Sequence, residues 1–144
     1  MSAVAFAPTP SVLSDGVELP RTPESVGTAR RWLVDTLSRW GIDVDTIETA
    51  RQLVSETVTN AIIHVRDEGS MTVTAAYWRG EVRVTVSDPG CDCSVVKQRV
   101  AFSQDENGRG LALLAALAKD HGCEQLFGGG KACFFVLDAD GSPS

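Results

Sequence analysis

Apolar residues recur at helical spacing in two stretches of the N-terminal half of the chain. The first stretch follows Thr22-Pro23-Glu24, where a hydroxyl suited to capping, a proline at the first helical position and an acid stand in the order typical of a helix start. It ends at Gly41. The second stretch begins near Asp45, which is able to cap it, and runs to about Val65. The spacing therefore predicts two consecutive helices.

A polar stripe follows one face of the second predicted helix. Its residues recur at every fourth position, so at about 100° per residue they drift slowly around the helix. They are Gln52, Glu56, Asn60 and His64. The apolar residues of the same helix occupy another face, which predicts a helix with one buried side and one polar side.

Strict alternation of apolar and polar residues marks the middle of the chain. Residues 71–78 and 81–87 alternate on either side of Arg79-Gly80, which predicts an antiparallel hairpin with one buried face. No periodicity is visible from Asp88 to Asn107. A loop of that length in a compact domain is usually functional, so this segment is of special interest.

A third helix and a second hairpin complete the pattern. The helix is predicted over Gly108–Gly122, between glycines at its entry and exit, and the hairpin pairs 124–127 with 131–137. A short strand at 17–19 precedes the first helix. Helices grouped with antiparallel hairpins predict an α+β fold, a two-layer sandwich in which a mixed, mostly antiparallel sheet carries the helices on one face.

The length of 144 residues fits one domain. Residues 1–15 are rich in proline and serine and show no periodicity, which predicts a flexible lead-in. The folded domain is expected over 16–138, and a polar tail over 139–144.

Charge and hydropathy narrow the choice of partners. Thirteen Lys and Arg stand against 19 Asp and Glu, for a net charge of −6, and no run of basic residues offers a face for phosphate backbones. This argues against direct binding of nucleic acid. No segment approaches the length of a membrane span, and no basic residue precedes Arg21 as a signal peptide requires, so we expect a cytoplasmic protein.

Four cysteines, Cys91, Cys93, Cys123 and Cys133, are expected to be thiols, because a reducing compartment does not sustain structural disulfides. Cys123 and Cys133 are expected to point into the sheet core as small apolar groups. A zinc site made of all four is the alternative interpretation, although the spacing lacks the two short pairs of zinc ribbons.

Three spaced elements carry residues that suit one ligand. They are Glu56-x-x-x-Asn60 on the second helix, Asp88-Pro89-Gly90 after a strand, and Gly108-Arg109-Gly110-Leu111 at the entry to the third helix. Taken singly, each is also typical of a solvated pair, a turn or a tight helix entry. Taken together, their chemistry indicates a nucleotide.

Each element has a physical use for that ligand. Glycines at a helix entry let backbone N–H groups approach a phosphate at the positive end of the helix dipole. Asn60 offers a neutral carbonyl oxygen to Mg²⁺, and Glu56, one turn earlier, is placed to take a proton from a hydroxyl or water that attacks a γ-phosphate. Asp88, fixed at a strand end, is able to accept a hydrogen bond from the exocyclic amine of adenine. The loop after Asp88 would then cover the nucleotide as a lid.

In this order the three elements resemble the N, G1 and G2 boxes of the GHKL (Bergerat-fold) ATPases, and the element order agrees from about residue 15 to residue 138. Within that superfamily, a short domain of this kind is similar to the anti-sigma factor serine kinases. The shared features are a Glu-Leu-Pro entry before a tryptophan-containing helix, the form Thr59-Asn60-Ala61, and a closing Gly-Gly-Lys strand.

The resemblance implies a role for each matching position. Glu56 would be the general base, Asn60 the Mg²⁺ ligand and Asp88 the adenine ligand, while Gly90 would let the chain approach the adenine pocket. The phosphate-contacting residues would be Gly108, Gly110 and Leu111, with Arg109 either reaching phosphate or lying at the surface. His64 would either touch phosphate or cap carbonyls at the helix end.

The implied function is that of an ATP- and Mg²⁺-dependent serine/threonine kinase. Such a kinase inhibits a sigma factor and phosphorylates a serine of a STAS-type anti-anti-sigma protein, and its relatives are often dimers, so a homodimer is one expected assembly. The boxes also fit a histidine-kinase catalytic domain, although the sequence shows no phosphoacceptor helix.

Two positions depart from the pattern of that group. Asp92 stands where a second glycine is usual, and a carboxylate there would repel phosphate. Ala132 stands where a hydroxyl residue often reaches toward the adenine region. Both favour an alternative function, an ATP-binding regulatory module without phosphotransfer.

Overall fold

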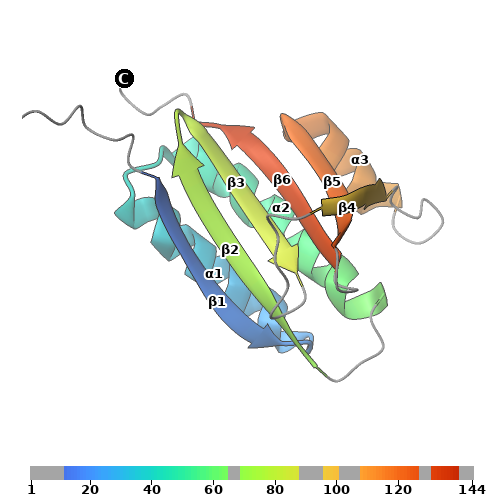
Figure 1. The fold of residues 1–144 in the computed structure, drawn as a ribbon. Coiled ribbons are helices and arrows are strands. Elements are labelled where there is room, and N and C mark those ends of the chain that lie inside the picture. The colour runs from blue at the N-terminus through green and yellow to red at the C-terminus, as the bar shows by residue number, and fades with distance from the viewer. Residues whose placement is uncertain (1–11, 65–68, 88–95, 101–107, 127–130, 140–144) are drawn as a thin grey trace, which may run out of the picture.

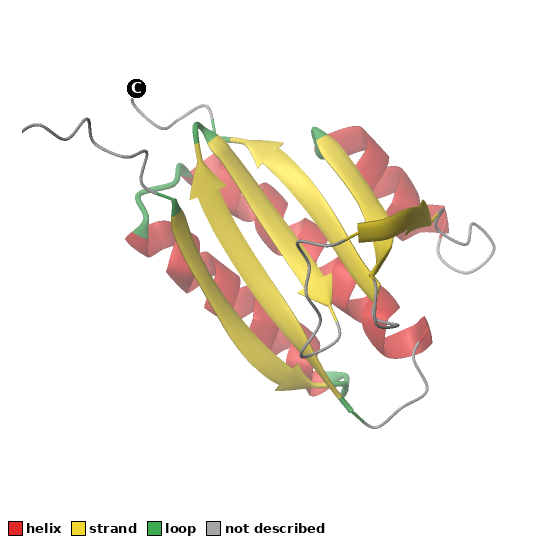
Figure 2. Cartoon of the chain, viewed as in Figure 1, coloured by secondary structure: helices red, strands yellow, loops and turns green. Residues whose placement is uncertain are grey.

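The computed structural model describes residues 12–64, 69–87, 96–100, 108–126 and 131–139. These residues form a six-stranded sheet and three helices. In chain order the elements are β1 (Leu13–Pro20), α1 (Glu24–Arg39), α2 (Val44–His64), β2 (Ser70–Trp78), β3 (Glu81–Ser87), β4 (Val96–Val100), α3 (Gly108–Leu117), β5 (Asp120–Leu126) and β6 (Lys131–Asp138). The strands lie in the order β1-β2-β3-β6-β5-β4, and all neighbouring pairs are antiparallel. Figures 1 and 2 show the three helices together on one face of the sheet. The predicted two-layer α+β fold is confirmed.

The hydrophobic core lies between this face of the sheet and the helices. Alternate residues of the central strands point into it, and each helix adds an apolar stripe, as the two periodicities of strand and helix require. The core side chains include Met71, Val73, Val82, Val84, Val86 and Phe135 from the sheet and Leu33, Leu37, Leu53, Val54, Val58 and Leu114 from the helices. Each such side chain contributes roughly 1.5–3 kcal/mol when it is fully buried. Among the described residues no helix is long and apolar enough to span a bilayer.

The first predicted hairpin is confirmed, with its turn at Arg79-Gly80. Both turn residues have positive φ angles, 52° and 79°. A two-residue turn of this kind matches the right-handed twist of the flanking strands, and the pairing of Trp78 with Glu81 closes it directly. Local sequence therefore sets the register of β2 against β3.

The first helix begins differently from the prediction and ends as predicted. Pro23 is the N-cap and makes no side-chain capping bond, so the expected hydroxyl cap from Thr22 is wrong. Instead, the Ser25 hydroxyl donates to the carbonyl oxygen of Pro20 at 2.6 Å, which ties the helix entry to the end of β1. Gly41, with a φ angle of 77°, ends the helix, as its lack of a Cβ permits.

The second helix is capped by Asp43 and not by Asp45. The Asp43 carboxylate accepts hydrogen bonds from the backbone N–H of Thr46 at 3.0 Å and from its hydroxyl at 2.6 Å. The N-cap accepts from the residue three positions later, so the cap is the aspartate that precedes the helix, while Asp45 lies in the first turn. Two aspartates two positions apart look equivalent in sequence, and the hydrogen bonds from Thr46 distinguish them.

Three further boundaries differ from the sequence prediction. Strand β4 lies within the stretch 88–107, which was expected to be a loop, and β1 begins at Leu13, so residues 13–15 belong to the sheet and not to the lead-in. The third helix ends at Leu117, and residues 120–122, expected to be helical, open β5. The backbone N–H of Lys119 donates to the carbonyl oxygen of Val136 at 2.8 Å, so pairing with β6 overrides helical continuation.

We predict that Asp43→Ala lowers the free energy of unfolding by about 1 kcal/mol, because two hydrogen bonds at the helix start are lost. Asp45→Ala is the matched control, and we expect a change of at most about 0.5 kcal/mol for this exposed residue. Urea denaturation followed by circular dichroism measures both. A larger effect at Asp45 than at Asp43 would contradict the assigned cap.

Candidate functional site

The polar stripe of α2 turns from solvent toward the core along the helix. Gln52 is exposed, Glu56 is half-buried and Asn60 is buried at 7% exposure. Residues four apart lie about one turn apart on the same side of a helix, and the slow drift of the stripe carries its later members inward. The structure therefore brings Glu56 and Asn60 to one face, with the amide deeper than the carboxylate. The side chain of His64 lies outside the described residues.

Serine and threonine hydroxyls around this pair are engaged within the helix. Thr57 donates to the carbonyl oxygen of Leu53 at 2.8 Å, and Thr59 donates to that of Ser55 at 2.6 Å. Among the described residues the Glu56 carboxylate has no hydrogen bond and no ion pair. An unpaired, half-buried carboxylate keeps both oxygens available to accept a proton.

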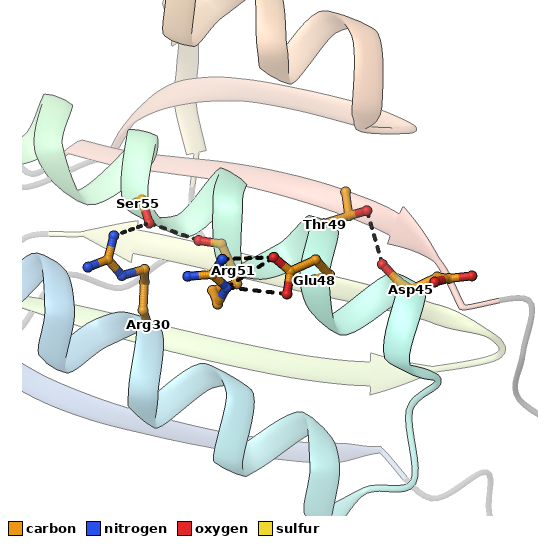
Figure 3. Close-up of polar contacts among 6 residues, drawn as sticks. All are labelled: Arg30, Asp45, Glu48, Thr49, Arg51 and Ser55. Atoms are coloured by element: carbon orange, nitrogen blue, oxygen red, sulfur yellow. Dashed lines mark hydrogen bonds and ion pairs between the residues drawn. The ribbon is translucent and has the colours of Figure 1, made fainter.

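The earlier turns of α2 are linked to α1 by arginine contacts. Figure 3 shows Arg30 reaching from α1 to the Ser55 hydroxyl, at 3.5 Å. Arg51 donates to the Glu48 carboxylate at 2.7 Å, and this hydrogen bond lowers the pKa of Glu48 and raises that of Arg51. The pair is exposed, so it adds little stability. The residues that make these contacts lie outside the polar stripe.

The second motif of the predicted site follows the end of β3 in the sequence. Ser87, the last residue of this strand, is buried between β2 and β6, where it pairs with Thr72 and Ala132. Helix α2 contacts both β3 and β6, and in Figure 1 its C-terminal part lies at the same end of the sheet as the arrowhead of β3. The end of β3, after which the sequence continues to Asp88, therefore lies at the end of the sheet where the C-terminal part of α2 lies. Asp88 and Gly90 themselves are outside the described residues.

The third element is the entry to α3. The helix begins at Gly108, as predicted, and it packs against α2 and places Leu114 in the core. The predicted phosphate-contacting residues, Gly108, Arg109, Gly110 and Leu111, form its first turn, where their side chains are not described. The structure therefore brings together the elements that carry the three motifs, while the contacts of the second and third motifs stay predictions.

Ala132 lies on the opposite side of the sheet from the core. It pairs with Ser87 on β3 and with Glu124 on β5, and it is 1% exposed. The residue after it, Cys133, pairs with Val86, which belongs to the core cluster. Because successive residues of a strand point to opposite faces, Ala132 is directed away from the helices. The hydroxyl that the resemblance leads one to expect at this position would therefore lie on the outer face of the sheet, the face that the helices do not cover.

Cys123 and Cys133 form a disulfide, so the expectation of free thiols at these positions is wrong. The two residues are direct partners in the β5–β6 pairing, which places their side chains side by side on one face. The signal was available in the sequence, since both cysteines stand equally far from Gly128 in the predicted turn. The expectation of thiols rested on a reducing compartment alone. The zinc alternative is also wrong for this pair, because its sulfurs are bonded to each other.

The donor set on α2 fits Mg²⁺ bound to a phosphate ligand. Magnesium prefers oxygen ligands and keeps several waters, so a site of this kind needs only one or two protein oxygens. The amide oxygen of a buried asparagine supplies one without adding a negative charge beside phosphate. No cluster of three or more His, Cys, Asp or Glu able to hold a metal occurs in the described part of the chain.

Comparison with known families gives a match over most of the chain. The profile of the histidine kinase-like ATPase domain matches residues 19–133. Two similar curated proteins carry the name serine-protein kinase RsbW. The protein from Listeria monocytogenes serotype 4a is 32% identical over 117 residues, which are 72% of this chain and 74% of that protein. The protein from Oceanobacillus iheyensis is 28% identical with the same coverage.

A solved structure is also similar. It is the crystal structure of the RsbU and RsbW domains of Rv1364c from Mycobacterium tuberculosis, with a TM-score of 0.64 and 26% identity. The similarity covers 92% of this chain and 33% of that one, so the chain spans about a third of that protein.

We predict that the two stripe residues differ in their effect on stability without nucleotide. Asn60→Ala should lower the free energy of unfolding by about 1–3 kcal/mol, because a buried amide is normally hydrogen-bonded and its partners are left unsatisfied. Glu56→Ala should change it by about 0.5 kcal/mol or less, since the carboxylate has no partner in the described structure. Urea denaturation measures both, and equal losses would contradict the different depths of the two side chains.

Proposed function

The chain belongs to the histidine kinase-like ATPase domain family, and from that premise we propose that it binds Mg·ATP and phosphorylates a serine of a protein partner. The observation that carries the proposal is the pair on α2. Asn60 is buried and suited to a cation, while Glu56, one turn away on the same face, has an unpaired carboxylate.

Each residue of the pair has a defined task in this reaction. Asn60 holds Mg²⁺ through its amide oxygen. Glu56 accepts the proton of the attacking serine hydroxyl as the serine oxygen bonds to phosphorus and the bond from the γ-phosphorus to the ADP oxygen breaks. Mg·ATP supplies the phosphoryl group and, through the metal, neutralises its charge. Helix α2 fixes the carboxylate and the amide relative to one another.

The remaining ligands are proposed from the sequence motifs. Asp88 binds the adenine amine, and Gly90 lets the chain lie close to the base. The first turn of α3 binds the phosphates through backbone N–H groups, at the residues Gly108, Arg109, Gly110 and Leu111. The start of a helix at Gly108 supports this last assignment, because the positive end of a helix dipole attracts anions.

We propose a STAS-type anti-anti-sigma protein as the phosphate acceptor and a sigma factor as the inhibited partner. The proposal rests on the resemblance to anti-sigma factor serine kinases and on the similar proteins named serine-protein kinase RsbW, of which this chain covers about three quarters. It places the protein in the cytoplasm, where both partners would be found. Assembly as a homodimer is part of the same proposal.

The alternative function is an ATP-binding regulatory module without phosphotransfer. The resemblance favours it at Ala132, where a hydroxyl is frequent in the active group, although in the structure this residue lies on the face of the sheet away from the helices. Asp92, outside the described residues, favours it as well, since its carboxylate would repel phosphate.

Glu56→Gln tests the kinase directly. The substitution keeps the size and polarity of the side chain and removes its basic oxygen, so we expect transfer from labelled ATP to STAS-domain proteins to fall about 100-fold or more. Binding of Mg·ATP, measured by calorimetric titration, should stay within a few-fold of the wild type. Gln52→Ala, one turn earlier and exposed, is the matched control and should change neither quantity.

Asn60→Ala tests the cation site in the same assays. We expect its affinity for Mg·ATP to fall about tenfold or more, at a temperature where the stability measurement shows the variant to be folded. Wild-type transfer by Glu56→Gln would contradict the role of general base. Binding of ATP by the wild type without formation of phosphoserine on any STAS protein would select the alternative, and absence of ATP binding would overturn both functions.

A further inference from the structure

The disulfide between β5 and β6 joins two residues of unequal exposure. Cys123 is 1% exposed, whereas Cys133 is partly exposed. The two positions face each other across the strand pair. Opposed positions on neighbouring strands hold the sulfurs close to each other in the reduced protein too, because the backbone pairing and not the bond sets the spacing. The geometry therefore suits a pair that forms and breaks its bond without rearrangement of the strands.

The cross-link lies beside the candidate nucleotide site. Cys133 pairs with Val86 on β3, one residue before the end of that strand, and Val86 belongs to the core that α2 covers. Paired residues share a face, so the disulfide lies on the side of the sheet where the helices pack. The next pair along the same strands is Ala132 with Ser87, after which the chain enters the Asp88 segment.

The cross-link also joins the two halves of the proposed site. Strand β5 follows α3 almost directly, since the N–H of Lys119 already bonds to Val136 on β6. In the described structure β5 pairs with β6 on one side and with the edge strand β4 on the other. A bond between β5 and β6 therefore fixes the α3 half of the site, which carries the phosphate-binding turn, to the sheet half, which carries the end of β3.

We propose that Cys123 and Cys133 form a reversible dithiol–disulfide site that sets the affinity of the proposed nucleotide site for Mg·ATP. The inference rests on the proposed binding of Mg·ATP. The disulfide form holds the two halves in their bound arrangement and binds the nucleotide more tightly. In the dithiol form only the backbone pairing joins β5 to β6, so this pairing opens transiently more often and the nucleotide is bound more weakly. We expect a difference of about 5-fold, at the low end of typical coupling between two sites.

The oxidant is a low-molecular-weight disulfide. The thiolate of Cys133, the more exposed residue, attacks one sulfur of the oxidant, forms a mixed disulfide and releases one thiol. The thiolate of Cys123 then attacks the sulfur of Cys133 and releases the second thiol. The two cysteines lose two electrons and two protons, and the oxidant gains both as two free thiols. Reduction by a small thiol reverses both steps.

The test uses the full chain with Cys91→Ala and Cys93→Ala, which retains the pair and removes the other two thiols. The protein is equilibrated in buffers of reduced and oxidised glutathione, its free thiols are alkylated, and mass spectrometry counts them. Mg·ATP affinity is measured for each form by calorimetry. We expect the disulfide form to bind about 5-fold more tightly. By reciprocity, saturating Mg·ATP should lower the midpoint potential of the pair by about 20 mV, at 29.6 mV per tenfold for two electrons.

A second variant adds Cys123→Ala and Cys133→Ala to the same background and should bind Mg·ATP with one affinity in every buffer. If this variant fails to fold, the redox titration of the protein that retains Cys123 and Cys133 still tests the inference, because that protein carries no substitution at either position. Failure to form the 123–133 disulfide in any buffer, or equal Mg·ATP affinities of the two forms, would overturn the inference and leave the proposed function intact. Absence of ATP binding by both forms would overturn the proposed function itself.

Discussion

Helix α2 packs across β3 and β6, and this packing orients the residues of the candidate site. Leu53, Val54 and Val58 bury one side of this helix in the core, and that burial sets the rotation of the helix about its own axis. This rotation fixes the direction in which Glu56 and Asn60 point from the helix. The direction of this pair is therefore a consequence of apolar packing, and a shift of the apolar stripe by one position would turn the pair by about 100° around the helix.

The three motifs lie far apart in the sequence, and the described elements next to them, α2, β3 and α3, are brought together by the contacts of α2. The hairpin β2–β3 carries the chain to the same end of the sheet as the C-terminal part of α2, and α3 packs against α2. Strands β6 and β5 lie between β3 and the edge strand β4, and β5 follows α3 along the chain. A nucleotide held by all three motifs would touch elements from both halves of the chain, which makes the relative position of β5 and β6 relevant to binding.

Local features were predictable from the sequence, and long-range pairing was not. The turn at Arg79-Gly80 and the end of the first helix at Gly41 are encoded by neighbouring residues, and so is the shared face of Glu56 and Asn60. Strand β4 was missed because its partner β5 lies about two dozen residues later, and an isolated five-residue strand carries no strong periodicity. The start of β5 was missed because pairing with β6 overrides the helical pattern before it. The burial of Asn60 depends on how α2 sits on the sheet, which the spacing alone does not give.

Direct contact between Asn60 and the cation of Mg·ATP is open to measurement by NMR. The chain holds two asparagines, Asn60 and Asn107, so protein labelled with ¹⁵N-asparagine gives two side-chain amide pairs in an NMR spectrum, and Asn107→Ser identifies which is which. We expect Mg·ATP to shift the Asn60 pair strongly and ATP with a chelator to shift it far less. An Asn60 pair that stays in place at saturating Mg·ATP would contradict this contact.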